Sequence, residues 1–231
     1  MRPVIRGDVP VNHNHQPVVY NDYKDARDDL IERMGDYCSY CEVALNSQVD
    51  VEHVLPKSLN PDHELDWSNF LLACGNCNSI KGNKDIDLAD YYWPDIDNTL
   101  RALVYEKDMP PQVVDDPDVD SDRVQETLDL TGLDRIPGHP KFSDRDRRWL
   151  KRMEAWGIAL RVASLLKVDD SDEMREMAIE VAIGRGFWSV WLHVFYDDID
   201  MCQRLIKAFP GTALECFDDD TNFVPRPGGA L

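Results

Sequence analysis

The sequence predicts an α+β fold in which a small zinc-stabilised unit is embedded in a mainly α-helical chain. The first observation is a cysteine quartet, made of two Cys-x-x-Cys pairs, Cys38/Cys41 and Cys74/Cys77. The second is the alternation of apolar and polar residues over 49–55, which is typical of a strand. The third is the return of apolar residues every three or four positions from 143 to about 209, which predicts helices.

The quartet predicts a structural zinc site. Each pair offers two thiolates from one tight turn, and the four together suit a tetrahedral Zn²⁺ ion. In a reducing cytoplasm such pairs favour zinc over disulfides. The remaining cysteines, Cys202 and Cys216, stand apart in the sequence, and we interpret them as small buried apolar residues.

The N-terminal half contains short elements. Residues 1–36 are expected to form an extended arm and a helix over 20–34, which Gly35 ends. Residues 37–95 are expected to form the zinc-stabilised core: the strand over 49–55 stopped by Pro56, a short apolar segment over 67–73, and a short helix or turn from Asn78. A connecting segment, 96–142, contains a possible strand over 99–105 and a helix capped by Ser121 and closed by Gly132.

The C-terminal region, 143–231, is expected to be helical. Ser143 is the expected N-cap of its first helix, and further helices follow over about 171–183, 187–196 and 198–209. This region holds four of the six tryptophans, Trp149, Trp156, Trp188 and Trp191. An aromatic stripe at helical spacing is typical of a core, and aromatic residues beyond the needs of a core are typical of an interface.

Charge limits the ways in which this chain can meet a nucleic acid. It has 44 acidic and 25 basic residues, a formal charge of −19. Any nucleic-acid role therefore needs a local basic patch, a metal ion or a basic partner. The strongest basic cluster is Arg145, Arg147, Arg148, Lys151 and Arg152, which is either the exposed face of a helix or a contact for DNA or a partner.

Hydropathy predicts a cytoplasmic protein that does not contact a membrane. No stretch approaches the roughly 20 apolar residues of a membrane helix. The first residues, Met-Arg-Pro-Val-Ile-Arg-Gly-Asp, lack the apolar core of a signal peptide.

The residues between the cysteine pairs resemble the HNH endonuclease family, which has a ββα-metal fold. The motif runs from Glu52-His53 through Pro56 to Asn69, and then to Asn78 directly after the second cysteine pair. The three motif letters fall on His53, Asn69 and Asn78, so that the third histidine is replaced by asparagine. The resemblance covers about residues 37–84.

This resemblance implies a role for each motif residue. His53 is the general base that takes a proton from the attacking water, and Glu52 and Asn78 are metal ligands. Glu52 neighbours His53 on a strand and points to the opposite face, unless the strand bends there. Asn69 ties down the loop that carries the base. Lys81 and Lys84 are expected to meet phosphates, with Lys57 a weaker candidate.

Two metals are therefore expected. Four thiolates suit Zn²⁺ as a structural ion. The oxygens of Glu52 and Asn78 suit Mg²⁺ or Mn²⁺ in catalysis.

A second resemblance is to retron- and Septu-associated HNH proteins of the PtuB type. It rests on the Arg-Pro-Val-Ile-Arg-Gly opening, the Tyr-Cys-Ser-Tyr-Cys-Glu knuckle and the stretch from Trp93 to Thr99. It implies an antiviral effector that cleaves DNA and works with an ATPase subunit. The tryptophans of residues 143–231 and the acidic charge of the chain lead us to expect that this partner docks there and brings the DNA. The alternative is a zinc-stabilised nucleic-acid-binding or scaffolding subunit without catalysis of its own.

Overall fold

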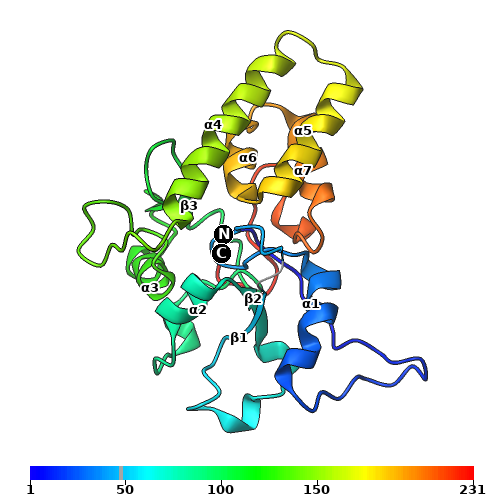
Figure 1. Ribbon diagram of the computed structural model, residues 1–231, viewed down its shortest axis with the longest axis vertical. Coiled ribbons are helices and arrows are strands. Elements are labelled where there is room, and N and C mark those ends of the chain that lie inside the picture. Colours follow the sequence, from blue (N-terminus) through cyan, green and yellow to red (C-terminus); the bar gives the residue numbers. More distant parts are fainter. Residues whose placement is uncertain (47–48) are drawn as a thin grey trace.

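The chain folds as a mixture of helices and two small sheets, so the α+β prediction is confirmed (Figure 1). The computed structural model describes residues 1–46 and 49–231. Its strands are β1 (Asp50–His53), β2 (Phe70–Ala73), β3 (Leu103–Val104) and β4 (Gln112–Val113). Its helices are α1 (Arg27–Met34), α2 (Gly75–Lys81), α3 (Ser121–Thr131), α4 (Arg148–Leu166), α5 (Asp172–Arg185), α6 (Trp188–Val194) and α7 (Ile199–Ala208).

The unit formed by β1, β2 and α2 is a ββα arrangement. The strands are antiparallel, with His53 opposite Phe70 and Val51 opposite Leu72. All four residues of β2 are buried, which explains their continuous apolar run. Helix α2 starts directly after Cys74, whose side chain accepts a hydrogen bond from the Cys77 amide at the beginning of the helix.

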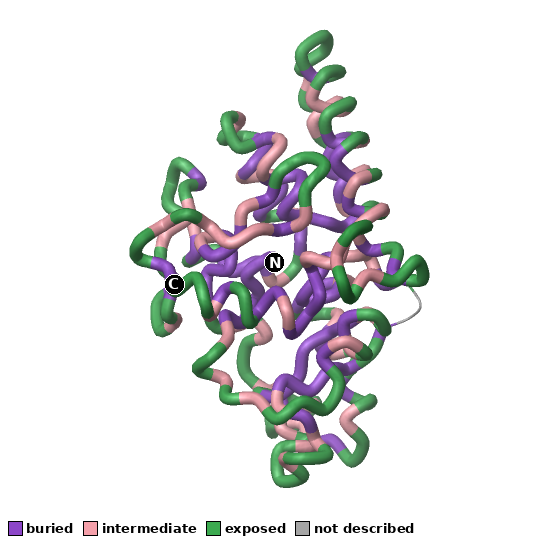
Figure 2. Tube along the Cα trace, turned by 90° about the vertical axis from the view of Figure 1, so that its left-hand side faces the viewer, coloured by how far each residue is buried: buried purple, intermediate pink, exposed green. Residues whose placement is uncertain are grey.

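The C-terminal helices form a second core. Helices α4 and α5 form a hairpin at the top of Figure 1, and α6 and α7 pack below it. The largest side chains of this core, Trp188, Trp191 and Phe209, are fully buried. Figure 2 shows buried residues gathered at the centre of the molecule and exposed residues at the free end of the hairpin.

Two expectations for the C-terminal region are corrected. Helix α4 begins at Arg148, not just after Ser143, because Asp146 is buried and bonds both the backbone and the guanidinium of Arg148. Trp156, Trp188 and Trp191 are buried in the core, so they do not mark an exposed docking surface. The core interpretation of the aromatic stripe is the one that the structure supports.

Smaller differences occur in the N-terminal half. The segment expected as a helix from residue 20 starts as a 3₁₀ turn over Tyr23–Ala26, capped by Asp22, before α1 begins. Gly35 ends α1 as expected, with φ of 76°. Asp120 rather than Ser121 caps α3, because its carboxylate accepts from the amides of residues 122 and 123. The possible strand over 99–105 is reduced to β3.

The helical region packs closely against the first zinc knuckle. The carbonyl oxygen of Glu42 accepts a hydrogen bond of 2.7 Å from the Phe187 amide, and the Glu42 carboxylate accepts two from Ser189. Gly186 has φ of 68°, and a Cβ there would come within 2.5 Å of the Glu42 carbonyl oxygen. Only glycine permits this approach.

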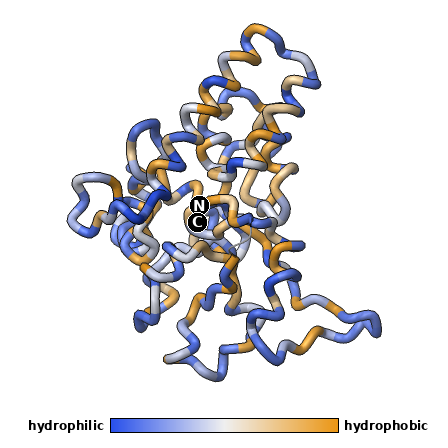
Figure 3. The backbone as a smooth tube through the Cα atoms, in the orientation of Figure 1, coloured by the Kyte–Doolittle hydropathy of each residue, from blue (hydrophilic) through white to orange (hydrophobic). Residues whose placement is uncertain are grey.

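Hydrophobic residues run through the centre of the fold and also appear at the free end of the α4–α5 hairpin (Figure 3). Across the described residues, the helices are too short or too polar to cross a membrane.

Candidate active site and zinc centre

The cysteine quartet is assembled as a metal site. The four sulfur atoms lie within 4.8 Å of one another, and Cys41 Sγ is 3.7 Å from Cys74 Sγ. A tetrahedral Zn²⁺ with Zn–S bonds of about 2.3 Å requires about 3.8 Å between sulfurs. No disulfide forms among the described cysteines. The donor set and its spacing therefore fit a structural zinc ion that ties the start of the ββα unit to its helix.

A buried arginine supports the quartet from outside the motif. Arg148 donates to Cys77 Sγ at 2.9 Å, to the carbonyl oxygens of Thr131 and Gly132 at 2.9 Å, and to Asp146. Four thiolates around Zn²⁺ carry a formal charge of −2, which this guanidinium partly offsets. Arg148 thus joins the zinc centre, the end of α3 and the start of α4. Its role was not expected from its place in the basic cluster.

The candidate active site is an open cleft of about 270 Å³ beside β1. It is lined by Glu52, His53 and Asn78, together with residues of the following loop and the end of α2, namely Pro56, Lys57, Ser58, Gly82 and Asn83. Strand β1 ends at His53 and the chain bends directly afterwards. A bend was expected near this point, and three consecutive residues of the strand, Val51, Glu52 and His53, all line the cleft.

His53 is held in one tautomer. Its Nε2 atom lies 2.9 Å from the carbonyl oxygen of Glu64. Because a carbonyl oxygen only accepts, Nε2 carries the hydrogen, and Nδ1 of the neutral ring keeps its lone pair. Burial lowers the pKa of His53 below its ordinary value, although the Glu64 carbonyl opposes this. The rings of Tyr23 and Phe70 contact the imidazole at 4.8 and 5.3 Å between centroids.

Asn69 ties the two ends of the loop between the strands. Its Oδ1 accepts from the Leu55 amide at 2.7 Å, and its Nδ2 donates to the carbonyl oxygens of Leu55 and His63 at 3.0 Å. Leu55 follows the bend after His53, and His63 precedes the residue that fixes the imidazole. Asn69 therefore ties this loop together, and it does not line the cleft.

Glu52 and Lys81 form a buried ion pair. Lys81 Nζ donates to Glu52 Oε1 at 2.9 Å and to the His53 carbonyl oxygen at 2.7 Å. Lys81 is 1% exposed and Glu52 is 4% exposed. Burial raises the pKa of Glu52, and Lys81 opposes that rise. The expectation that Lys81 meets phosphate does not fit this geometry, because its ammonium is used within the protein.

The other predicted lysines are placed differently. Lys57 lines the cleft, pairs with Glu64 at 3.0 Å and lies 4.0 Å above the Tyr23 ring. Lys84 is exposed but is not among the cleft residues, and burial together with the nearby charges of Arg135 and Lys141 lowers its pKa. Lys57 is consequently the lysine best placed to meet a phosphate in the cleft.

Asp50 is a neighbour of the cleft residue Asn78 that the motif did not point to. Asn78 Nδ2 donates to Asp50 Oδ2 at 3.1 Å, and the charge of Asp50 contributes to raising the pKa of Glu52. The period of two along a strand could have identified it, because Asp50 and Glu52 share one face of β1. Because Asn78 uses its amide nitrogen in this bond, its carbonyl oxygen stays unengaged within the described chain, and Asp50, Glu52 and Asn78 place side-chain oxygens on β1 and α2.

Comparison with known proteins agrees with this geometry. Residues 38–84 match the HNH endonuclease family. Over 59 residues the chain is 39% identical to the Septu protein PtuB of Bacillus thuringiensis, a match that covers 24% of this chain and 23% of PtuB. The match therefore spans about a quarter of that relative's length. Residues 38–84 therefore carry an HNH endonuclease domain, and part of the chain is similar to PtuB.

Proposed function

We propose that this chain is a metal-dependent HNH DNA endonuclease that hydrolyses phosphodiester bonds. The observation that carries the proposal is His53, because its Nε2–H is fixed by Glu64 while the ring lines an open cleft beside oxygen ligands. A zinc-binding module without catalysis has no need of a histidine held in a single tautomer next to Asp50, Glu52 and Asn78.

The proton transfer follows from the position of His53. Its lowered pKa keeps the imidazole neutral near pH 7, so Nδ1 can accept a proton from a water molecule in the cleft. The bond to Glu64 keeps the ring from turning as it gains charge, and the resulting imidazolium keeps that bond because both nitrogens then donate. Lys57, at the same cleft, can meet a phosphate oxygen as a point charge.

The oxygen donors fit a hard divalent cation. Asp50, Glu52 and Asn78 offer two carboxylates and one amide, the ligand types that Mg²⁺ and Mn²⁺ prefer. Such an ion would neutralise charge that develops on the phosphate and on the leaving oxygen. In the described part of the chain, the quartet is the one group of three or more His, Cys, Asp or Glu side chains close enough to hold a metal. Because acidic side chains alone do not form a second metal site in this part of the chain, a bound Mg²⁺ or Mn²⁺ ion would need the Asn78 oxygen and water molecules as further ligands.

A plasmid-nicking assay tests the proposal. The purified chain is assayed alone and with the protein encoded beside it, in Mg²⁺, Mn²⁺ or EDTA. We expect cleavage with the divalent ions, none with EDTA, and a loss of about 10²- to 10⁴-fold in His53→Ala. His63→Ala is the matched control, because His63 is a half-exposed histidine ten residues away that bonds Asp66.

The outcomes separate the candidate functions. Cleavage that survives His53→Ala contradicts the assignment of the base. DNA binding without cleavage by the parent protein in any metal or complex favours the alternative, a zinc-stabilised binding or scaffolding subunit. Equal zinc content in both histidine variants shows that the fold is intact in each.

We further propose that the chain acts in an antiphage defence complex with an ATPase subunit, because 59 of its residues are 39% identical to the Septu protein PtuB. The docking region is proposed to lie on the C-terminal helices. Leu165, Val168 and Met177 on the α4–α5 hairpin are large apolar residues exposed by 49, 86 and 61%. Val168→Asp with Met177→Asp should abolish co-purification with the ATPase. Val19→Asp, a similar change at an 82% exposed valine elsewhere, should not.

A further inference from the structure

A second pocket, of about 430 Å³, lies between the second zinc knuckle and the foot of α4. Arg145, Arg147 and Lys151 line it together with Gly75 and Asn76 at the start of α2. We call it the basic pocket. A Cβ added at Gly75 would meet no atom within 4 Å, so the space beside this residue is open.

The three cations of the basic pocket are available to a ligand. Arg145, Arg147 and Lys151 are exposed, and no acidic side chain in the described chain forms an ion pair with any of them. The other two members of the predicted basic cluster, Arg148 and Arg152, are buried. The cluster therefore divides into a buried part, in which Arg148 bonds Cys77 and Arg152 bonds the Leu133 carbonyl oxygen, and an exposed part that forms no ion pair within the described chain.

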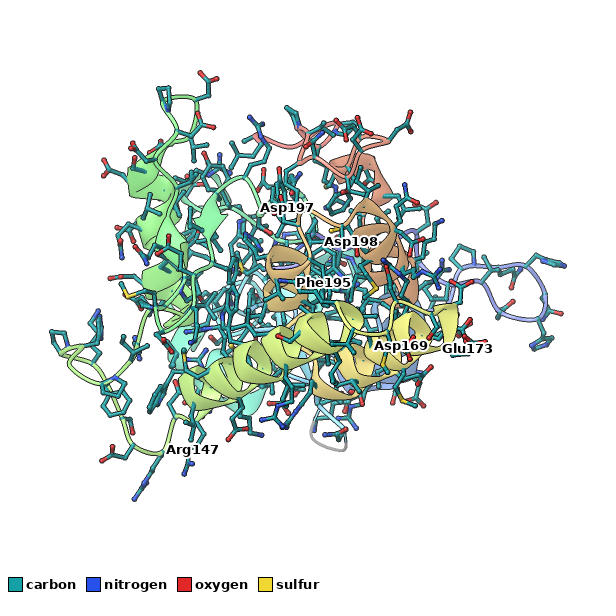
Figure 4. The ribbon with its side chains drawn as sticks, turned by 90° about the horizontal axis from the view of Figure 1, so that it is seen from above. Arg147, Asp169, Glu173, Phe195, Asp197 and Asp198 are labelled. Carbon is teal, nitrogen blue, oxygen red and sulfur yellow. The ribbon has the colours of Figure 1, made fainter. Side chains whose placement is uncertain are left out.

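The local charge opposes that of the whole chain. Residues 143–152 contain five basic and two acidic residues, a formal charge of +3 in a protein of −19. One of the two acids, Asp146, is buried and bound to Arg148. Figure 4 shows Arg147 at one end of α4, and Asp169 and Glu173 at the opposite end beside α5.

The length of α4 separates the basic pocket from the acidic residues Asp169 and Glu173 at the other end of the helix. A helix of 19 residues is about 28 Å long. Exposed charges are largely screened beyond about 8 Å at physiological salt. The acidic end of α4 therefore does little to weaken attraction of an anion to the foot of α4.

The basic pocket adjoins the candidate active site along one face of α2. Gly75 lines the basic pocket, whereas Asn78 and Gly82 line the cleft. A step of three residues places Gly75 and Asn78 on the same side of α2, and Gly82 directly follows the end of that helix. Gly75 and Asn78 are separated by about 4.5 Å along the axis. Each strand of B-DNA carries a phosphate about every 3.4 Å of axis, so DNA in the cleft would bring further phosphates past the basic pocket.

We propose that the basic pocket binds the phosphate backbone of duplex DNA and positions it for cleavage in the neighbouring cleft. The proposal rests on the nuclease function proposed above. Arg145, Arg147 and Lys151 act as backbone contacts and carry no sequence preference. They give a strongly acidic chain a local route to DNA, through a segment that lies outside the HNH domain.

Equilibrium binding tests the proposal. The probe is a fluorescein-labelled 30-base-pair duplex, titrated with the full chain carrying His53→Ala, in EDTA at 50 to 200 mM KCl. The test variant adds Arg145→Gln, Arg147→Gln and Lys151→Gln. The control variant instead adds Arg161→Gln, Lys167→Gln and Lys207→Gln, which remove the same charge from exposed residues elsewhere. Zinc content is measured for every protein.

We expect the test variant to bind the duplex about tenfold or more weakly at 50 mM KCl, with a salt slope that is smaller by up to about 2.7. The control variant should keep the parent slope. Equal slopes in the parent and test variant, or no measurable binding by the parent at 50 mM, would overturn the proposal. A loss seen with RNA of the same length but not with the duplex would overturn the assignment to DNA.

Cleavage is scored separately, with His53 restored. If the parent cleaves plasmid and the test variant binds and cleaves as well as the parent, the basic pocket is refuted and the nuclease function stands. If no protein cleaves but the duplex affinity still falls in the test variant alone, the basic pocket stands and the nuclease function fails.

Discussion

Replacing Lys81 by Met should strongly destabilise the protein. Methionine keeps an unbranched apolar stem but removes the ammonium that bonds Glu52 and the His53 carbonyl oxygen. Because both members of the pair are almost fully buried, the change leaves an unpaired carboxylate in the interior, which typically costs about 3–5 kcal/mol. With a urea slope of about 2 kcal/mol per molar, the unfolding midpoint should fall by about 1.5–2.5 M.

The loss should depend on pH and on divalent cations. Burial already raises the pKa of Glu52, and removing Lys81 raises it further. A carboxyl group whose pKa is higher in the folded than in the unfolded state destabilises the fold at high pH, and this penalty fades as pH falls. The deficit of Lys81→Met should therefore shrink between pH 8 and pH 5. If Glu52 is a metal ligand, Mg²⁺ should also stabilise this variant more than the parent, by supplying the missing positive charge.

Urea unfolding followed by tryptophan fluorescence measures these effects. Lys84→Met, at an exposed lysine three residues away, is the matched control and should change the free energy of unfolding by no more than about 0.5 kcal/mol. Glu52→Leu combined with Lys81→Met should recover most of the stability, because neither charge is then left unpaired. A loss below about 1 kcal/mol for Lys81→Met, or a deficit independent of pH, would refute the description of a buried ion pair.

Three further predictions concern the same domain. Elemental analysis should find one zinc ion per chain. Cys77→Ser should lower both the zinc content and the thermal stability, because structural zinc is coupled to folding. Full zinc content in this variant would contradict the proposed zinc site. Asn69→Ala removes three hydrogen bonds and should cost about 2–4 kcal/mol in urea unfolding. Asn69→Asp should cost at least as much, because its second carboxylate oxygen would face the carbonyl oxygens of Leu55 and His63, which only accept; a stability equal to that of the parent in either variant would argue against this tie. The cleavage rate should stay constant as the pH falls to about 6.5 and should decrease at lower pH. The reason is that burial lowers the pKa of His53 and that only the neutral ring accepts a proton. A decrease that begins near pH 8 would rule out His53 as the titrating base.

Features that depend on local chemistry were predictable from the sequence. The quartet follows from ligand type and spacing, and the four sulfurs do come together. Gly35 and Gly132 end their helices with positive φ, as a residue without a Cβ is expected to do. The tie made by Asn69 and the bend after His53 came from the family resemblance, and both are present.

Features that depend on tertiary packing were not predictable in the same way. A lysine at the end of a short polar helix is typically exposed, and Lys81 is buried only because β1 places Glu52 opposite it. The start of α4 is set by Asp146 bonding Arg148, which in turn depends on the position of Cys77. Asp50 lay within reach of sequence reasoning through strand periodicity, but the motif drew attention only to the adjacent Glu52 and His53.

The bonds of Arg148 limit how the HNH domain can be exchanged between proteins. A graft of residues 37–95 alone would lack Arg148, whose guanidinium bonds Cys77. It would also lack the end of α3, where Arg148 bonds the carbonyl oxygens of Thr131 and Gly132. Deleting residues 143–231 would also remove this guanidinium. If such a shortened chain failed to bind a partner, the cause could be either lost folding or a lost docking surface. The smallest transferable unit that keeps these bonds therefore extends through α3 and into the first turns of α4, well beyond the 38–84 stretch that matches the HNH endonuclease family.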